Sequence, residues 1–533
     1  MKSSLKKAVT ALLAAALLAA TPCTSVFGAQ TYYVNDGSST LTMADAYAIG
    51  ASGEAAKLPD RGVYAATANG TQMLGGTEYD DVQPNVPNGL IRAGLAFGST
   101  ALDAVHLQIK TGSGFAFGYY DEEAGRVFRV VGSTAESSVA VVADTNVTVG
   151  SSAFGAYHIE LGDTYTDFEA AQAAAAAHGG YPVFYNGTYR VRIGSFETAD
   201  AASASSAAAS GSVVSGGSRG VLVVKAGTDE ILFGFDCGST KSLTLAPQNS
   251  SGAAITQVAE CKYRSTDRSC MYYGDFQFTR FDTQQPQKLT LVNFVDLESY
   301  VKGVVPYEMS SGWPLEALKA QAVCARTYAA SHMNGVPAYG FDITATTTSQ
   351  VYLGTIEASA NSDRAVDETA GKFVRYQGKL CETFFFAADG GATENSENVW
   401  VAEVPYLRGV IDPYEKDIDF YCKSWGTSVS RDAVGDISVT YTPIGNVMTV
   451  TVGGKTYSKD NVRTFLTKIC GLRYNSRHFT VEYDAASNVY NVVGGGYGHN
   501  CGMSQWGAKA MAEVHGKTYE EIISFYYTGA YVS

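Results

Sequence analysis

Charged residues are scarce in this sequence, and positive charge is the scarcer sign. Asp, Glu, Lys and Arg make up 17% of the 533 residues, and 52 acidic residues against 38 basic ones give a formal net charge of −14. A nucleic acid requires a basic face that neutralises its phosphates, and an anionic membrane attracts polybasic segments. We therefore expect no nucleic-acid partner and no electrostatic membrane binding, whereas a neutral polymer is a compatible ligand.

Long apolar runs are missing except at the N-terminus. Residues 1–29 carry Lys2, Lys6 and Lys7, then the apolar run Ala8–Ala20, then small residues, which is the pattern of a secretory signal peptide. The run is shorter than the roughly 20 residues that span a bilayer, so an uncleaved N-terminal anchor is the less favoured alternative. We predict a protein that is secreted or held in the cell wall, outside the cytoplasmic membrane, with no integral membrane segment after signal cleavage.

The sequence also lacks any C-x-x-C pair, although it has 9 cysteines. Disulfides are compatible with export, but their connectivity cannot be deduced from the sequence. Structural zinc sites usually draw on closely spaced cysteine and histidine pairs. We therefore predict no metal and no cofactor.

Glycine and aromatic residues are plentiful, with Gly 56, Tyr 34 and Phe 24, which is typical of a strand-rich, tightly turned protein. The length predicts about two to four domains. Residues 30–89 are polar and read as an N-terminal segment and linker, with a short strand at Thr31–Val34. Residues 90–153 and 227–292 alternate apolar and polar residues in short runs between glycines, which predicts two parts of one β region.

Residues 156–226 differ from the β region on either side. AYHIELG predicts a strand, FEAAQAAAAAHGG a helix that glycines stop, and YPVFYNGTYRVRIGSF a hairpin that turns at Asn186-Gly187. ADAASASSAAAS could form a second helix before a closing strand, VLVVKA; a flexible linker over Ala199–Gly220 is the alternative. The β-α-β-β-α-β order and YRVRIGSF resemble a SPOR domain. That resemblance implies binding of peptidoglycan glycan strands without stem peptides, through Tyr189, Arg190 and Arg192.

The segment from Asn293 to Met333 predicts two helices with a polar break between them. The first covers Leu297 to about Val304, and the second starts at Pro314, a favoured first helical residue, and is apolar around most of its circumference. Glu308 lies in the break, beside Tyr307 and Met309. A partly desolvated carboxyl group has a raised pKa and suits proton donation near neutral pH. A solvated or helix-capping carboxylate is the alternative.

VVPYEMSSGWPLEALKAQAVCARTYA resembles the signature segment of the stage II sporulation protein D family, which also contains the amidase enhancer. Three further stretches resemble segments of that family: FDITATTTSQVYLG, FFFAADGGATENSENVW and GGGYGHNCGMSQWGAKAMA. The resemblance implies a mixed α/β catalytic domain over residues 293–533 and Glu308 as the catalytic residue of a lytic transglycosylase. Some members bind zinc through His-Cys before Q-x-Y; Thr348-Ser349 stand there in this chain, so we again expect no metal.

Polar residues of the family-like segments are candidates for binding sugar hydroxyl and acetamide groups. They are Arg326, Gln350, Tyr352, Thr393, Glu394, Asn395, Ser396, His499, Ser504 and Gln505. Alternatives remain open for three sites: structural pairing of Arg326, helix capping by Ser504, and a turn at Thr393–Ser396.

Together these observations predict an α+β protein. It would have a strand-rich, discontinuous N-terminal region with an inserted βαββαβ SPOR-like domain, followed by the mixed α/β catalytic domain. The expected reaction cleaves the MurNAc–GlcNAc bond of glycan strands, and the 6-hydroxyl of MurNAc attacks to leave a 1,6-anhydro end. One alternative is a non-catalytic, wall-binding enhancer of an N-acetylmuramoyl-L-alanine amidase, which would make a cell-wall amidase a partner. Another is a hydrolase with Glu394 or Glu397 as second carboxylate.

Overall fold

The computed structural model describes residues 80–533, apart from 251, 265, 282–284 and 286. Ahead of residue 80 it describes short strands only: β1 (Tyr33–Val34), β2 (Tyr47–Ile49), β3 (Ala55–Lys57), β4 (Tyr64–Thr67) and β5 (Gly70–Met73). The strand predicted at Thr31–Val34 coincides in part with β1. The predicted signal peptide, residues 1–29, lies outside the described residues, as does most of the segment 30–89.

The chain folds into two compact units that exchange segments. Unit 1 contains Gly312–Ser331 and Gly371–Ser533 together with the described residues up to Gln83, and unit 2 contains Pro84–Ser311 and His332–Ala370. The stretch 293–533, which the sequence groups in one domain, is therefore divided between the two units.

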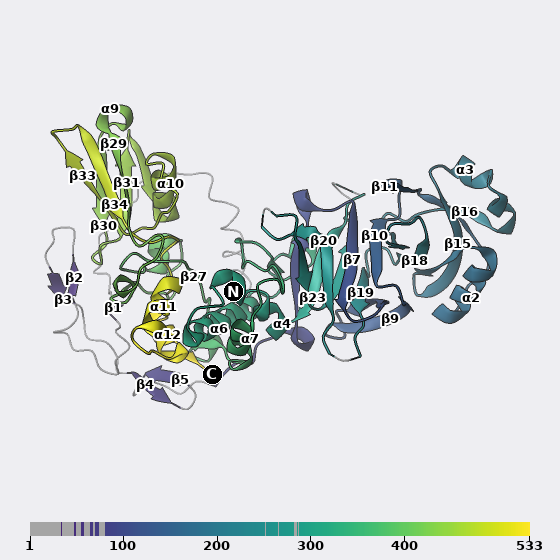
Figure 1. The fold of residues 1–533 in the computed structure, drawn as a ribbon, viewed down its shortest axis with the longest axis horizontal. Coiled ribbons are helices and arrows are strands. Elements are labelled where there is room, and N and C mark those ends of the chain that lie inside the picture. Colours follow the sequence, from purple (N-terminus) through teal and green to yellow (C-terminus); the bar gives the residue numbers. More distant parts are fainter. Residues whose placement is uncertain are drawn as a thin grey trace. The chain divides into compact units, whose positions relative to one another are not determined.

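A seven-stranded sheet forms one part of unit 2. Its strands, in spatial order, are β24 (Ile343–Thr344), β6 (Leu90–Ala96), β23 (Thr290–Asp296), β22 (Asp275–Thr279), β19 (Leu243–Pro247), β8 (Phe115–Asp121) and β9 (Val127–Thr134). Strand β19 pairs with β8, with Leu245 opposite Phe117, and β23 pairs with β6. Strands from both parts of the predicted β region thus share this sheet, and Figure 1 shows purple and teal arrows side by side in it.

A ten-stranded sheet forms the other part of unit 2. Its order is β16 (Ser212–Ser215), β13 (Tyr157–Glu160), β15 (Thr188–Phe196), β14 (Tyr181–Tyr185), β18 (Ile231–Asp236), β17 (Val221–Lys225), β10 (Ser138–Ala143), β7 (Ala104–Thr111), β20 (Ile255–Lys262) and β21 (Ser269–Tyr272). Strands β10 and β17 are buried along nearly their whole length, as their continuous apolar runs predict. A small hairpin joins β11 (Val147–Val149) to β12 (Ser152–Phe154).

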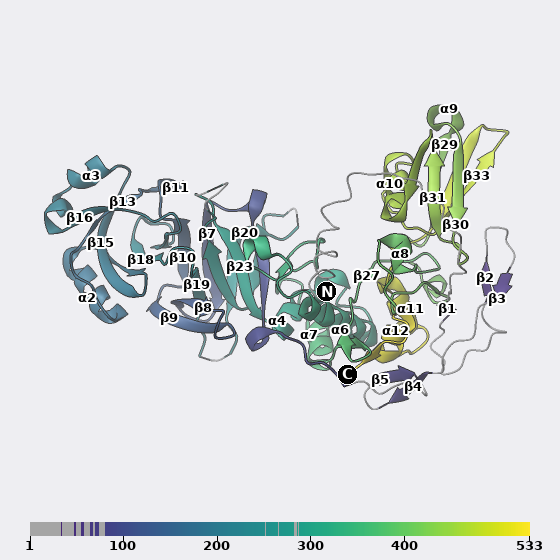
Figure 2. The same ribbon diagram turned by 180° about the vertical axis from the view of Figure 1, so that it is seen from behind.

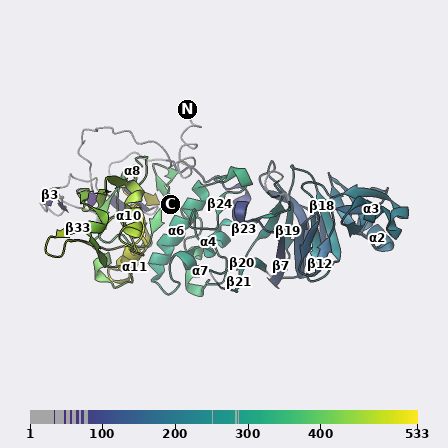
Figure 3. The same ribbon diagram turned by 90° about the horizontal axis from the view of Figure 1, so that it is seen from above.

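The predicted order β-α-β-β-α-β occurs in the insert. Helix α2 (Phe168–His178) begins at Asp167, whose carboxylate accepts the Ala170 N–H at 2.8 Å, and stops at Gly179 with φ 68°. Helix α3 (Ala199–Ser203) follows β15, and both helices lie beside the insert strands (Figure 3). The predicted closing strand is wrong, however, because β16 pairs with β13 and closes the insert, whereas VLVVK forms β17 between β10 and β18.

Short helices follow β23 in unit 2. The predicted first helix is confirmed as α4 (Leu297–Lys302), which Asp296 caps by accepting two main-chain N–H groups. The predicted polar break contains a further single turn, α5 (Val305–Glu308), with a proline in its first turn. Helix α7 (Ala360–Asp367) packs against α4. Glu308 is therefore the last residue of a helix rather than part of an open loop.

The central element of unit 1 is the long helix α6 (Leu315–Ser331). It is buried around nearly its whole circumference, as its sequence predicts. Helices α11 (Gln505–Glu513) and α12 (Tyr519–Tyr526) pack against it. Both are drawn in yellow in Figure 1.

Small sheets make up the rest of unit 1. Two of them are strand pairs, β27 (Phe385–Phe386) with β35 (Met503–Ser504) and β28 (Val410–Ile411) with β1. Three have three strands each, given in spatial order: β26 (Lys379–Leu380), β25 (Val374–Tyr376), β36 (Tyr531–Val532) in the first and β29 (Trp425–Ser430), β34 (Val489–Gly494), β33 (Phe479–Asp484) in the second. The third consists of β30 (Ile437–Tyr441), β31 (Val447–Val452) and β32 (Lys455–Ser458). The remaining α-helices are α8 (Ser396–Val399), α9 (Arg431–Val434) and α10 (Val462–Lys468). Helix α10 packs on β31 and β32 (Figure 2), and Phe465 and Val450 lie in their shared core.

Two negative findings apply to the described residues alone. Within them, no helix combines the length and the apolar character that crossing a membrane requires. The cysteines from Cys237 to Cys501, all of them described, form no disulfide with one another.

Candidate functional site

Glu308 is half-buried at the C-terminal end of α5. Its Oε1 atom accepts a hydrogen bond from the main-chain N–H of Val351 at 3.1 Å. The neighbouring Tyr307 donates its hydroxyl to the Leu353 carbonyl at 3.2 Å and accepts the Glu357 N–H at 3.2 Å. The segment 351–357 therefore bonds to the last two residues of α5, Tyr307 and Glu308, and two family-like segments meet at this point.

Gln350 and Tyr352, which flank Val351, point into the interior of unit 2. Each is 1% exposed. Gln350 accepts the Tyr300 hydroxyl at 3.0 Å, and Tyr352 donates its hydroxyl to Asn293 at 2.7 Å. These bonds hold the Val351 N–H in place under Glu308, so the structure makes both residues positioning groups. A direct sugar contact by either one stays a prediction.

Gly354 completes the same segment. Its φ is +75°, and a Cβ added there would lie 1.9 Å from the Met271 carbonyl oxygen. The Thr355 N–H donates to that same oxygen at 2.7 Å. Only glycine combines this backbone conformation with so close an approach, which gives a physical reason for glycine at the end of the Q-x-Y-x-G segment.

The segment Thr393–Ser396 in unit 1 forms an internal framework. All of its residues are at most 1% exposed. Glu394 accepts the Asn395 N–H at 2.8 Å, the Asn398 amide at 2.9 Å and the Thr442 hydroxyl at 3.2 Å. Thr393, Asn395 and Ser396 accept main-chain N–H groups within residues 404–410, and Ser396 also donates its hydroxyl to the carbonyl of residue 402.

Neither glutamate of the hydrolase alternative has the setting of a catalytic carboxylate. Glu394 is fully buried by those contacts, and Glu397 forms an ion pair with Arg408. A hydrolase needs a second carboxylate that faces the substrate. Both glutamates therefore have internal partners, and a role as second carboxylate stays a prediction.

The remaining candidates of unit 1 also have internal contacts. Arg326 is fully buried on α6 and donates to the Lys372 carbonyl at 3.3 Å. Ser504 accepts the Gly507 N–H at 3.1 Å, so the capping alternative for Ser504 is confirmed. Gln505 donates to Gln321 at 3.3 Å. Sugar binding by these side chains stays a prediction.

His499 is held as a neutral ring. Its Nε2 lies 3.1 Å from the Phe385 carbonyl, and its Nδ1 accepts the Cys501 N–H at 3.2 Å, which assigns the proton to Nε2. The rings of Phe386 and Trp400 lie 5.1 and 5.2 Å from it. Burial lowers the pKa of His499 to about 4, so the ring is uncharged at neutral pH.

An aromatic surface of unit 1 was not predicted from the sequence. Its members are Trp313, Phe420, Tyr421, Tyr474, Tyr497 and Trp506. Phe420 stacks on Trp506 with ring centres 4.9 Å apart, and Tyr421 and Tyr497 are 56% and 37% exposed. Tyr497 interrupts the glycine-rich run GGGYGH, and an aromatic residue at that position was the one feature of the sequence that could have indicated this surface.

Of the three predicted glycan-binding residues of the insert, Arg190 has the most exposed side chain. Tyr189 is buried and donates to the Val131 carbonyl at 2.9 Å. Arg192 pairs with Glu160 and Asp144, and its side chain is 4% exposed. Arg190 also pairs with Glu160, but its side chain keeps 31% exposure. The glycan-binding role of the three residues stays a prediction.

Comparisons with known proteins identify relatives of the chain. A family model described as stage II sporulation protein matches residues 285–376. An uncharacterized protein of Brachyspira hyodysenteriae (strain ATCC 49526 / WA1) is 38% identical over 274 residues, which are 48% of this chain and 71% of that protein.

Two relatives from Bacillus subtilis (strain 168) have descriptive names. The first is stage II sporulation protein D, which is 34% identical over 45% of this chain and 76% of its own length. The second is an amidase enhancer, which is 31% identical over 43% of this chain but only 39% of its own length.

Proposed function

Because the chain belongs to the family of stage II sporulation protein D and the amidase enhancer, we propose that it is an exported peptidoglycan lytic transglycosylase. Its substrate would be glycan strands without stem peptides, and Glu308 would act as general acid and then general base. The observation that carries the proposal is the fixed, half-buried carboxylate of Glu308, which a main-chain N–H holds in one position.

The proposed reaction needs one proton-exchanging group. Protonated Glu308 gives its proton to the GlcNAc O4 oxygen as the bond from that oxygen to MurNAc C1 breaks. The resulting carboxylate then takes the proton of the MurNAc 6-hydroxyl as its oxygen bonds to C1. Glu308 is restored, and no water is consumed. This balance fits a chain in which Glu394 and Glu397 are held in internal contacts.

The aromatic surface supports a separate part of the proposal, namely that unit 1 binds sugar. Rings that expose one face offer a rigid apolar platform beside polar edges, which suits the mixed apolar and polar faces of a pyranose. Lys509 lies 5.3 Å from the Trp506 ring centre and pairs with Glu513; the lactyl carboxylate of a MurNAc without stem peptide would compete with Glu513 for this charge.

Tyr421→Ala is expected to weaken binding of stem-peptide-free glycan strands about 2- to 10-fold, the range of one aromatic contact. Pull-down of the full chain with purified glycan measures the effect. Tyr483→Ala is the matched control, because Tyr483 is 44% exposed and lies in β33 outside the aromatic surface. Equal binding by Tyr421→Ala and wild type would remove the aromatic surface from the proposal.

The insert is proposed to be a second glycan-binding part. Arg190 is the residue to test, because its side chain is 31% exposed and lies at hydrogen-bonding distance from Glu160. Arg190→Ala should lower the fraction of full-length protein retained on denuded glycan while leaving retention on peptide-bearing peptidoglycan less changed. Unchanged retention on both polymers would argue against a SPOR-like role.

A non-catalytic enhancer is the second candidate function, and the similarity to the amidase enhancer favours it. Both functions require glycan binding, but only one makes new ends. Incubation of the protein with denuded glycans, followed by mass spectrometry, separates them: 1,6-anhydroMurNAc ends support the transglycosylase. Intact strands, together with faster release of peptides by an added cell-wall amidase, support the enhancer.

A further inference from the structure

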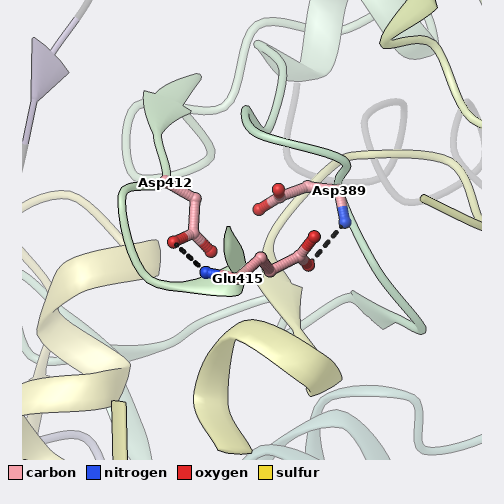
Figure 4. Close-up of side chains that lie close together, drawn as sticks. All are labelled: Asp389, Asp412 and Glu415. Carbon is pink, nitrogen blue, oxygen red and sulfur yellow. Dashed lines mark hydrogen bonds between the residues drawn. The ribbon is translucent and has the colours of Figure 1, made fainter. Parts of the chain in front are cut away.

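Three acidic side chains of unit 1 converge in its interior (Figure 4). Asp389 lies between β27 and α8, Asp412 directly follows β28, and Glu415 begins a short 3-10 helix, Glu415–Asp417. One carboxylate oxygen from each lies within 4.8 Å of the others, and the residues are 0%, 5% and 3% exposed. We propose that Asp389, Asp412 and Glu415, here called the carboxylate cluster, bind one divalent cation, with Ca²⁺ the ion that fits best.

Neutral donors hold the cluster in place. Glu415 accepts the N–H groups of Asp389 and Gly390 at 2.8 and 2.9 Å and the Ser504 hydroxyl. Asp412 accepts the Tyr526 hydroxyl at 2.6 Å and the Tyr414 N–H at 2.7 Å. These bonds orient the carboxylates before any ligand arrives. Oε1 of Glu415 and Oδ1 of Asp412 each accept two donors, so the lone pairs left for a cation are on Oε2 of Glu415, Oδ2 of Asp412 and Oδ2 of Asp389.

One oxygen of the cluster points to a missing ligand. Oδ1 of Asp389 accepts the Gly391 N–H at 2.7 Å, but Oδ2 is buried and accepts no N–H group and no hydroxyl of the described residues, and the Asp389 side chain faces the Asp412 carboxylate. Within that part of the chain, no Lys or Arg forms an ion pair with any member of the cluster. Buried carboxylates are normally paired or coordinate metals, and an unsatisfied buried acceptor costs about 1–3 kcal/mol.

Three carboxylates this close and this deeply buried repel one another when all are charged. One divalent cation offsets two of the three negative charges and contacts the unpartnered Asp389 oxygen, whereas one proton offsets a single charge.

Hydration favours Ca²⁺ over Mg²⁺. Mg²⁺ dehydrates reluctantly and usually keeps several waters, whereas Ca²⁺ is held by about 6–8 oxygen ligands in flexible geometry. The cluster oxygens lie within 4.8 Å of one another in the protein interior, which suits Ca²⁺. Carboxylates can bind Ca²⁺ through both oxygens, which suits a buried site with little water.

A cation here would join three parts of unit 1. Glu415 bonds to the loop at Asp389 and to Ser504, which caps α11, and Asp412 bonds to Tyr526 of α12. The expected result is a higher thermal stability of the loaded protein, by mass action on the folded state. The sequence has no C-x-x-C pair, but this does not argue against the site, since its ligands are carboxylates that are far apart in the sequence.

The test is Ca²⁺ titration of full-length protein that has first been stripped with a chelator and dialysed. We expect about one Ca²⁺ per chain by calorimetry and a rise in the unfolding midpoint. Asp389→Asn keeps the side-chain size but removes the charge of the unpartnered oxygen, so its Kd should rise at least tenfold. Asp419→Asn is the control, because Asp419 lies in the same loop with a 99% exposed side chain, and its Kd should not change.

Several outcomes would overturn the site. If wild-type protein binds neither Ca²⁺ nor the luminescent probe Tb³⁺, the carboxylates of the cluster share protons instead of binding a cation. This conclusion needs no variant. Ca²⁺ binding that persists unchanged in Asp389→Asn would place the ion elsewhere. If Asp389→Asn does not fold, Glu415→Gln is tested by the same criterion. In wild type, Ca²⁺ should displace one equivalent of bound Tb³⁺, and the Tb³⁺ emission excited through tyrosine should then fall.

Discussion

Glu308→Gln is expected to lower the rate of anhydro-end formation by at least about 10²-fold, and by up to about 10⁴-fold, the range of general acid–base catalysis. Glutamine keeps the size of the side chain and can still accept the Val351 N–H through its amide oxygen. It cannot give or take a proton. Release of 1,6-anhydroMurNAc from denuded glycans, followed by mass spectrometry over time, measures the rate.

Glu298→Gln on α4 serves as the matched control for this change. Glu298 lies in the first turn of that helix in the same unit, and Asp296 rather than Glu298 caps it. We expect near wild-type rates from this variant. Glycan binding and the unfolding midpoint should be similar in both variants. A Glu308→Gln protein that releases anhydro ends at the wild-type rate would show that Glu308 is not the acid.

Gly354→Ala is expected to destabilise the protein by about 2–5 kcal/mol and to reduce activity with it. The left-handed backbone costs a non-glycine residue about 1–2 kcal/mol, and overpacking adds about 1–3 kcal/mol. Here the new Cβ would meet the Met271 carbonyl oxygen at 1.9 Å. Relief of that clash must move the segment that carries Val351, and with it the N–H that holds Glu308.

Gly340→Ala separates the two contributions. Gly340 has φ +73°, close to the +75° of Gly354, but a Cβ there would meet nothing within 4 Å. This variant should therefore lose only the backbone contribution of about 1–2 kcal/mol and keep its activity. Equal losses of unfolding free energy in the two variants, measured by denaturant titration, would mean that the close approach to Met271 has no cost.

Helices with strong local signals could be predicted from the sequence. Helix α6 follows Pro314 and carries apolar residues on all sides, and the structure buries it accordingly. Helix α2 ends at Gly179, where only a residue that tolerates φ 68° fits easily. In both cases the deciding information lies within a few residues of the element itself.

Elements that depend on a distant partner were predicted less well. Strand β16 has the sequence SVVS, whose two valines give a weak apolar pattern, and it forms because β13 offers an open edge. The stronger run VLVVK looked like the closing strand, but its apolar residues on both faces suit the middle of a larger sheet.

The candidate site was predicted in part, for a similar reason. The sequence placed Glu308 in a polar break ahead of a long helix, but its bond to Val351 joins residues 43 positions apart. Thr393–Ser396 looks like a polar ligand loop, yet its side chains satisfy internal main-chain groups. The carboxylate cluster draws on three separated acids that form no local pattern.

We propose that a single carboxylate, Glu308, closes the anhydro ring without water. Digestion of denuded glycan strands in water enriched in ¹⁸O, followed by mass spectrometry of the products, tests this directly. We expect 1,6-anhydroMurNAc ends that carry no ¹⁸O and that are lost with Glu308→Gln. Reducing ends that contain ¹⁸O, or strands that stay intact with wild-type protein, would rule out this reaction.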